Sequence, residues 1–151
     1  VLRTFSKAMA LAGLRLGYLL AAPQLVTEIR KAVLPYNLNA FSQTAAEVAV
    51  ELYERELDSI VKKIISERQR LFNSLSAIRG LEPVASQANF IIVRSIVPPA
   101  EVFNELVERD ILIRDVSGYP MLSEYFRVSV GTPEENDLLI SALAEIMAKR
   151  Y

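Results

Sequence analysis

The sequence predicts a mixed α/β chain whose C-terminal half is a small α+β domain. Three observations predict this fold class. Apolar residues recur at helical spacing over a long stretch, residues 42–78. After Gly80 the pattern changes to short β-branched runs that alternate with helical segments. The last segment has the composition of a well-capped helix. This order of elements fits a small sheet that helices cover on one face.

The N-terminal third predicts one strand, one short helix and a connector. Residues 16–22 form an apolar run that is typical of a buried strand, and Pro23 ends it. Residues 24–33 place apolar side chains at helical spacing with charges on the other face, which predicts an amphipathic helix. Residues 35–43 are polar and rich in turn formers, and by composition alone they are a connector.

The longest predicted element is a helical region with Ser42 as its N-cap. We expect a break over residues 54–57, because the apolar stripe shifts by five residues there. A coiled-coil seam is the structural alternative, although the sequence lacks a strict heptad. Gly80 is expected to close the region as a C-terminal stop.

The C-terminal half predicts three strands and two helices. The strands are expected at residues 90–93, 111–113 and 126–130. A helix is expected to start at the Pro98-Pro99 pair and to run through Arg109. The final helix opens on Thr132, with proline in its first turn and glutamate three residues after the cap. That arrangement is a complete capping box.

Composition excludes several classes of function. A chain of 151 residues, 52% of them hydrophobic, is long enough for one domain or for parts of two. The net charge of −1 and the lack of a basic cluster argue against nucleic acid. The sequence contains neither cysteine nor histidine, so we expect no disulfide, no thiolate chemistry and no metal site. No apolar run approaches the roughly 18 residues of a membrane span, and no secretory signal is visible, so we expect a cytoplasmic protein that does not bind membranes.

The residues most suited to chemistry gather near the N-terminus. Ser6 precedes Lys7, and Arg15 follows between Gly13 and Gly17. A hydroxyl, an arginine fork and glycine-relaxed backbone together suit a phosphate group. A lysine amine is a nucleophile only when neutral, and burial or a neighbouring cation favours that form. The alternative is a solvated turn at Ser6 and Lys7, with Arg15 as a structural ion-pair partner.

A second pair of cations lies in the C-terminal half. Arg114 follows one predicted strand, and Arg127 lies within another. If these strands are neighbours, both guanidinium groups can converge on one anion, such as a carboxylate or a phosphate. The alternative is that each arginine pairs with a local acid, such as Asp115 or Glu124.

The run T-F-S-K-A-M-A-L-A-G-L-R-L-G-Y, residues 4–18, resembles a family motif. The motif T-x-S-K-A-x-x-L-A-G-L-R-x-G-Y is the lysine segment of pyridoxal-phosphate aminotransferases of the aspartate aminotransferase fold, and the run is most similar to the histidinol-phosphate aminotransferase family. The resemblance implies that Lys7 bonds covalently to pyridoxal 5'-phosphate and that Ser6 and Arg15 hold the cofactor phosphate. It implies Thr4 as a further cofactor contact.

Other segments resemble the same family. F-R-V-S-V-G-T-P-E-E-N-D is similar to the family's R-[IV]-[ST]-[VI]-G-T-x-E-E-N, which implies that Arg127 binds the anionic end of the substrate. I-L-I-R-D matches the segment that places a second arginine, Arg114, near the substrate phosphate. P-Y-N-L-N-A-F-S-Q is similar to P-Y-N-x-N-x-x-S-Q, which implies that Tyr36 and Asn37 line the site. S-Q-A-N-F matches the S-x-A-N-F entry to a strand.

The resemblance implies a homodimeric enzyme of histidine biosynthesis. It would transfer an amino group between L-histidinol phosphate and 2-oxoglutarate, with glutamate and imidazole-acetol phosphate as the partners of the reverse direction. Residues 1–41 would be the end of the large cofactor-binding domain, and residues 42–151 the linking helices and the small domain. Two other functions of the fold stay open, those of threonine-phosphate decarboxylases and of aromatic aminotransferases.

The family's other cofactor contacts precede the lysine. Among them are the glycine-rich phosphate cradle and the aspartate that pairs with the ring nitrogen. Because the chain begins with valine and enters the lysine motif at once, we expect it to be the C-terminal part of a longer polypeptide and inactive alone. The alternative from a different class is a non-catalytic dimerisation or interaction module.

Overall fold

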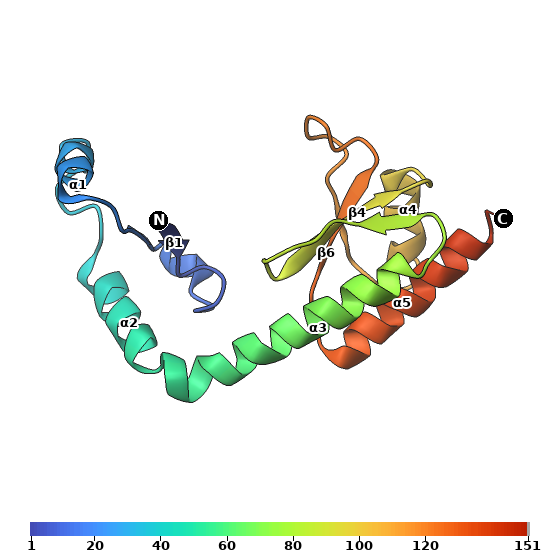
Figure 1. Cartoon of the computed structure of the whole chain (residues 1–151), viewed down its shortest axis with the longest axis horizontal. Helices are drawn as coiled ribbons and strands as arrows, with labels where there is room; N and C mark the ends of the chain where they lie inside the picture. The colour runs from blue at the N-terminus through green and yellow to red at the C-terminus, as the bar shows by residue number, and fades with distance from the viewer. Residues whose placement is uncertain (151) are drawn as a thin grey trace. The chain divides into compact units, whose positions relative to one another are not determined.

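The computed structural model describes residues 1–150 and contains two compact units, Val1–Val61 and Lys62–Tyr151 (Figure 1). The division falls in the first turn of helix α3 (Asp58–Ser76). Helices and strands alternate along the chain, which confirms the predicted mixed α/β class. No helix in this described part is long and apolar enough to cross a membrane. The predicted domain boundary after residue 41 concerns a larger protein, and it stays a prediction.

The first unit begins with two short antiparallel strands, β1 (Leu2–Thr4) and β2 (Gly17–Leu19). The loop between them contains a 3₁₀ turn, Ala12–Leu14. The prediction of a buried strand over residues 16–22 is wrong in extent and burial, because only Leu16 is buried there. Two strands of three residues have too little surface to bury themselves on both faces.

Two helices follow in the first unit, α1 (Pro23–Arg30) and α2 (Ala40–Glu51). Pro23 occupies the first position of α1, where its missing N–H costs nothing. The predicted N-cap Ser42 is wrong, because the cap of α2 is Asn39. The Asn39 Oδ1 accepts a hydrogen bond from the Ser42 backbone N–H at 2.8 Å. Ser42 itself lies in the first turn, where it is buried.

A π-helical turn, Tyr53–Leu57, lies between α2 and α3 and coincides with the predicted break. In a π turn each hydrogen bond spans five residues, one more than in an α-helix. The turn therefore rotates the apolar stripe around the helix axis while the helical path continues. Gly80 takes a positive φ of 91° in the turn after α3, a conformation that glycine adopts without steric cost.

The second unit contains a four-stranded antiparallel sheet in the order β3-β4-β6-β5. The strands are β3 (Leu81–Pro83), β4 (Phe90–Ser95), β5 (Arg114–Asp115) and β6 (Tyr125–Ser129). The predictions at residues 90–93 and 126–130 are confirmed, and β3 was not predicted.

The predicted strand at residues 111–113 is wrong. These residues are irregular, and pairing with β6 starts only at Arg114. The Ile111 N–H donates to the Leu106 carbonyl at 3.0 Å, and Asp110 has a left-handed φ of 58°. The start of this segment therefore still satisfies a carbonyl of the preceding helix, and pairing with the sheet begins after it.

Three helices cover one face of the sheet: α3, α4 (Pro99–Val107) and α5 (Pro133–Ala148) (Figure 1). Alternate residues of the two central strands form the buried face. They pack with apolar residues of all three helices, such as Leu71, Val102 and Leu143. The predicted one-sided cover is therefore confirmed. The other face of the sheet carries half-buried Phe90, Ile92 and Arg127.

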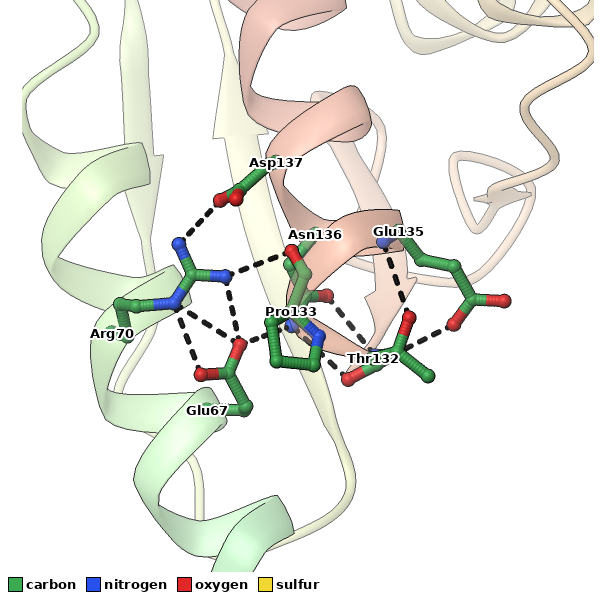
Figure 2. Close-up of polar contacts among 8 residues, drawn as sticks. Glu67, Arg70, Thr132, Pro133, Glu135, Asn136 and Asp137 are labelled. Carbon is green, nitrogen blue, oxygen red and sulfur yellow. Dashed lines mark hydrogen bonds and ion pairs between the residues drawn. The ribbon is translucent and has the colours of Figure 1, made fainter.

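The predicted capping box of the last helix is confirmed. The Glu135 N–H donates to Thr132 Oγ1 at 3.2 Å, and the Thr132 N–H donates to Glu135 Oε2 at 2.8 Å (Figure 2). The two bonds satisfy backbone donors that the first helical turn leaves open.

Candidate functional site

The first candidate site is the loop of residues 5–16, which β1 and β2 hold at both ends. Phe5 and Leu16 are buried at its base, and the Phe5 N–H donates to the Leu16 carbonyl at 3.1 Å. Thr4 Oγ1 donates to that carbonyl at 3.3 Å and accepts a hydrogen bond from the Ser6 N–H at 3.1 Å. These bonds fix the backbone where Ser6 and Lys7 leave the strand.

Arg15 closes the loop on the other side. Its backbone is left-handed, with φ of 54°, and its Nη1 donates to the Ala12 carbonyl at 3.0 Å. At Gly17 an added Cβ would lie 2.8 Å from the Arg3 carbonyl oxygen, so the close approach of the two backbones requires glycine there. At Gly13 an added Cβ would meet open space, and the structure gives no such requirement.

Ser6, Lys7 and Arg15 thus belong to one loop. The Lys7 and Arg15 side chains are exposed, and neither forms an ion pair with any residue from 1 to 150. The sequence contains no acidic residue before Glu28. A hydroxyl and two cations without a nearby acid are suited to a phosphate dianion, and a lysine amine is suited to an aldehyde. The residues present therefore fit pyridoxal phosphate, while their individual roles stay predictions.

Tyr36 and Asn37 lie in the connector before α2. The Tyr36 side chain is 98% exposed, and its backbone is left-handed with φ of 58°. Asn37 is also exposed. No hydrogen bond within the described residues holds either side chain, so their predicted place beside a site stays a prediction.

The second candidate site is the open face of the sheet in the second unit. Arg114 of β5 and Arg127 of β6 are direct cross-strand partners, so the strands are neighbours, which is the condition for both guanidinium groups to converge on one anion. The local acids are engaged elsewhere. Glu124 accepts a hydrogen bond from Arg94 Nε at 2.9 Å, and Asp115 Oδ1 accepts one from the Ser117 N–H at 2.8 Å. Over residues 1–150 neither Arg114 nor Arg127 forms an ion pair.

Arg127 is the most unusual polar side chain of this face. Its Nε is buried and has no hydrogen-bond partner within the described chain. Its Cζ lies 5.1 Å from the centroid of the Phe90 ring, which is within the range of a cation–π contact. Buried polar atoms nearly always have a partner, so an unpaired one points to a group that the chain itself does not supply. A carboxylate or phosphate would suit the guanidinium group that carries this donor.

The Phe90 contact was not predicted from the sequence. Its only sequence signal is an aromatic residue at the start of a strand. The contact follows from the pairing of β4 with β6, in which Phe90 lies opposite Ser129 and Ile92 opposite Arg127. That register requires knowledge of the sheet order.

A polar cluster outside both candidate sites holds the start of α5 against α3 (Figure 2). Arg70 donates to Glu67, to Asp137 and to the Pro133 carbonyl. The hydrogen bond from Arg70, and then the one from Asn136, lower the pKa of Glu67, and Glu67 and Asp137 raise the pKa of Arg70.

Asn136 is the buried member of this cluster. Its Nδ2 donates to Glu67 Oε2 at 2.9 Å and to the Gly131 carbonyl at 3.1 Å, while its Oδ1 accepts from the Gly131 N–H at 3.0 Å. The amide thereby fixes the turn through which β6 leads into α5.

Comparison with known proteins gives consistent matches along the chain. Residues 1–143 match the family described as aminotransferase class I and II. Histidinol-phosphate aminotransferase 1 of Carboxydothermus hydrogenoformans is 48% identical over 150 residues, which cover 97% of this chain and 41% of that protein. The chain therefore spans about two fifths of the length of this relative.

Two solved structures are similar to this chain over nearly its whole length. The histidinol-phosphate aminotransferase of Sinorhizobium meliloti, in complex with pyridoxal-5'-phosphate, has a TM-score of 0.77 and 30% identity, covering 99% of this chain and 41% of that one. The L-threonine-O-3-phosphate decarboxylase of Porphyromonas gingivalis has a TM-score of 0.83 and 25% identity, covering 97% of this chain and 46% of that one.

Proposed function

This chain belongs to the class I and II aminotransferase family, and from that membership we propose that it provides the cofactor-bearing lysine and the substrate-binding arginines of a histidinol-phosphate aminotransferase. The observation that carries the proposal is the single loop that contains Ser6, Lys7 and Arg15 with no acid beside them. The name of the Carboxydothermus relative supports the choice of substrate.

In the proposed enzyme the loop residues have different tasks. The Ser6 hydroxyl and the Arg15 guanidinium bind the cofactor phosphate, because both donate hydrogen bonds to its oxygens. The Lys7 Nζ would hold the cofactor covalently, and as a free amine it would move a proton at the reacting carbon atoms. Pyridoxal phosphate, when bound, withdraws electrons from the substrate and so makes loss of that proton feasible. Thr4 holds the two ends of the loop through its hydrogen bonds to Leu16 and Ser6, and it is a cofactor contact in this proposal.

The substrate anchor in the proposal is Arg127, with Arg114 as its neighbour. Two adjacent guanidinium groups suit a phosphate or carboxylate, because each group donates two parallel hydrogen bonds. Histidinol phosphate and 2-oxoglutarate, with their products, all carry such groups. Tyr36 and Asn37 belong to the proposal as further substrate-binding residues.

A second candidate function is decarboxylation of threonine phosphate. The structural likeness to the Porphyromonas decarboxylase favours it. Both substrates are phosphate monoesters, so the arginine pair alone does not separate the two functions. Aromatic transamination differs, since its substrates lack a phosphate.

The test of the cofactor assignment is borohydride reduction in the presence of pyridoxal phosphate, followed by mapping of the modified lysine. In the full-length protein we expect reduction to attach the cofactor covalently to Lys7. Lys31, which is exposed and pairs with Glu28, should stay unlabelled. The 151-residue chain is expected to give no such selective labelling, as is the Lys7→Ala variant of the full-length protein. Equal labelling of Lys7 and Lys31 in the full-length protein would contradict the enzyme assignment.

The test of the substrate assignment is a set of single-turnover spectral changes on the full-length protein. Histidinol phosphate, threonine phosphate and phenylalanine are compared at equal concentration. We expect the largest response with histidinol phosphate. An equal response to all three would defeat the narrow assignment and leave a broad aminotransferase.

The proposal includes a cytoplasmic homodimer, as the family resemblance implies. Sedimentation equilibrium of the full-length protein checks the dimer. A mass that stays monomeric at micromolar concentration would contradict it.

A further inference from the structure

We propose that Phe90 is a positioning residue for Arg127, which it holds in the orientation that binds the substrate anion. This inference rests on the proposed function, in which Arg127 is the substrate anchor. It adds Phe90 to the residues that affect substrate binding. The Phe90 side chain has no hydrogen-bonding group, so it affects the substrate only through the Arg127 guanidinium.

The geometry places the ring beside the cation. Phe90 lies opposite Ser129, and Arg127 lies two residues before Ser129 on the same strand. Residues two apart on a strand project from the same face, so Phe90 and Arg127 are diagonal neighbours on the open face. The Arg127 Cζ is 5.1 Å from the ring centroid, inside the limit of about 6 Å for a cation–π contact.

The ring has a different task from the core residues beside it. Ile91, the next residue of β4, is fully buried and belongs to the core. Phe90 is half-buried on the opposite side of the same strand, and it is not a member of that core. Its ring therefore contacts side chains of the open face, and one of these contacts is with the Arg127 guanidinium.

Arg127 needs this support because no hydrogen-bonding or acidic group of the described chain fixes its guanidinium. Its Nε is buried without a partner, and no acid pairs with it over residues 1–150. Its cross-strand neighbour on the β5 side is a second cation, Arg114, which repels it. Phe90 supplies attraction from the β4 side, so the three residues lie on three adjacent strands with Arg127 in the middle. A long side chain without a hydrogen-bond partner thereby loses freedom before the anion arrives, which lowers the entropic cost of binding.

The test uses the full-length protein with histidinol phosphate as the amino donor. Phe90→Leu removes the ring, and Phe90→Tyr keeps it. We expect Phe90→Leu to raise KM by roughly threefold to tenfold, with kcat within about twofold of the parent, because only the anchoring of the substrate is weakened. Phe90→Tyr should keep the KM of the parent. The matched control is Phe72→Leu, because Phe72 is also partly buried but packs against the core.

A double-mutant cycle separates this inference from the proposed function. Phe90→Leu should have no further effect on KM in an Arg127→Ala background, because its effect passes through the guanidinium. If Arg127→Ala leaves KM unchanged, the assignment of the substrate anchor fails. If Arg127→Ala raises KM but Phe90→Leu does not, or does so equally in both backgrounds, the anchor stands and the role of Phe90 is overturned.

A spectroscopic readout covers the case of a weakened fold. The Nε–H resonance of Arg127 feels the ring current of Phe90, so it should move in Phe90→Leu and stay nearly in place in Phe72→Leu. An unmoved resonance in Phe90→Leu would overturn the inference independently of any activity.

Discussion

Arg114 and Arg127 are cross-strand partners, so two guanidinium groups project from the same face of the sheet with no acid between them. Like charges directly opposite each other destabilise an antiparallel pair. A chain that keeps such a pair therefore loses some stability in the absence of an anion. A bound anion would reverse the sign of that contribution.

Replacing Arg114 by glutamine should stabilise the second unit in the absence of anions. We expect the free energy of unfolding at low salt to rise by roughly 0.2–1 kcal/mol, because a repulsion is removed. The gain should shrink as salt screens the charges. Inorganic phosphate should stabilise the parent more than Arg114→Gln. Chemical denaturation with and without phosphate, at two salt concentrations, measures both effects.

The matched control for this prediction is Arg94→Gln on the same sheet. Arg94 pairs with Glu82 and Glu124, so its removal takes away attractions in place of a repulsion. The two variants should therefore change stability in opposite directions. Destabilisation by Arg114→Gln of the same sign as that by Arg94→Gln would contradict the interpretation of the arginine pair.

Gly17→Ala should loosen the lysine loop. The new Cβ would lie 2.8 Å from the Arg3 carbonyl oxygen, which is backbone and cannot rotate away. Overpacking of this kind costs about 1–3 kcal/mol. Hydrogen exchange of the Phe5 amide, which bonds the Leu16 carbonyl, should accelerate at least about fivefold. Gly13→Ala is the control, because its Cβ would meet open space, and it should leave this exchange unchanged.

Local patterns predicted those parts of the structure that short segments determine. The capping box at Thr132 and the break before α3 depend on a few neighbouring residues, and both are present. Residues 111–113 show the limit of such patterns. Their two isoleucines have strand propensity, yet the Ile111 N–H still bonds the Leu106 carbonyl of α4. The turn that ends α4 therefore outweighs the strand propensity of these residues.

Contacts across the fold were beyond the sequence pattern. The hydrogen bond from Asn136 to Glu67 spans 69 residues, and the ring of Phe90 meets Arg127 only through the strand order. The motif at residues 4–18 indicated the lysine loop, because its chemistry lies within one short segment. The support of Arg127 needed the register of three strands.

Asn136→Ala should destabilise the second unit. Asn136 is buried and makes three hydrogen bonds, so its loss leaves the Gly131 N–H and carbonyl without their partner. We expect a loss of about 1–3 kcal/mol in the free energy of unfolding. Urea denaturation followed by far-ultraviolet circular dichroism measures it. Asn104→Ala, on the exposed side of α4, should change stability little or raise it slightly, since alanine favours helix. Equal effects of the two variants would show that Asn136 does not hold the turn.

The second unit should lose stability in acid as Glu67 takes up a proton. Hydrogen bonds from Arg70, and then from Asn136, hold the Glu67 pKa in the folded chain below its ordinary value of 4.5. Below pH 4.5 the unfolded chain takes up a proton at Glu67 while the folded chain keeps the carboxylate ionised. The contribution of Glu67 to the free energy of unfolding is therefore complete above this pH and is lost as the pH falls through the lowered pKa.

Between about pH 5 and pH 3 the free energy of unfolding should fall less steeply in Glu67→Gln than in the parent. Some slope should remain, because the pKa of Glu105 is also lowered, chiefly by Lys149. Glu108→Gln, at an exposed position, is the control. If Glu67→Gln kept the slope of the parent, the carboxylate would not contribute to the folded state through these hydrogen bonds.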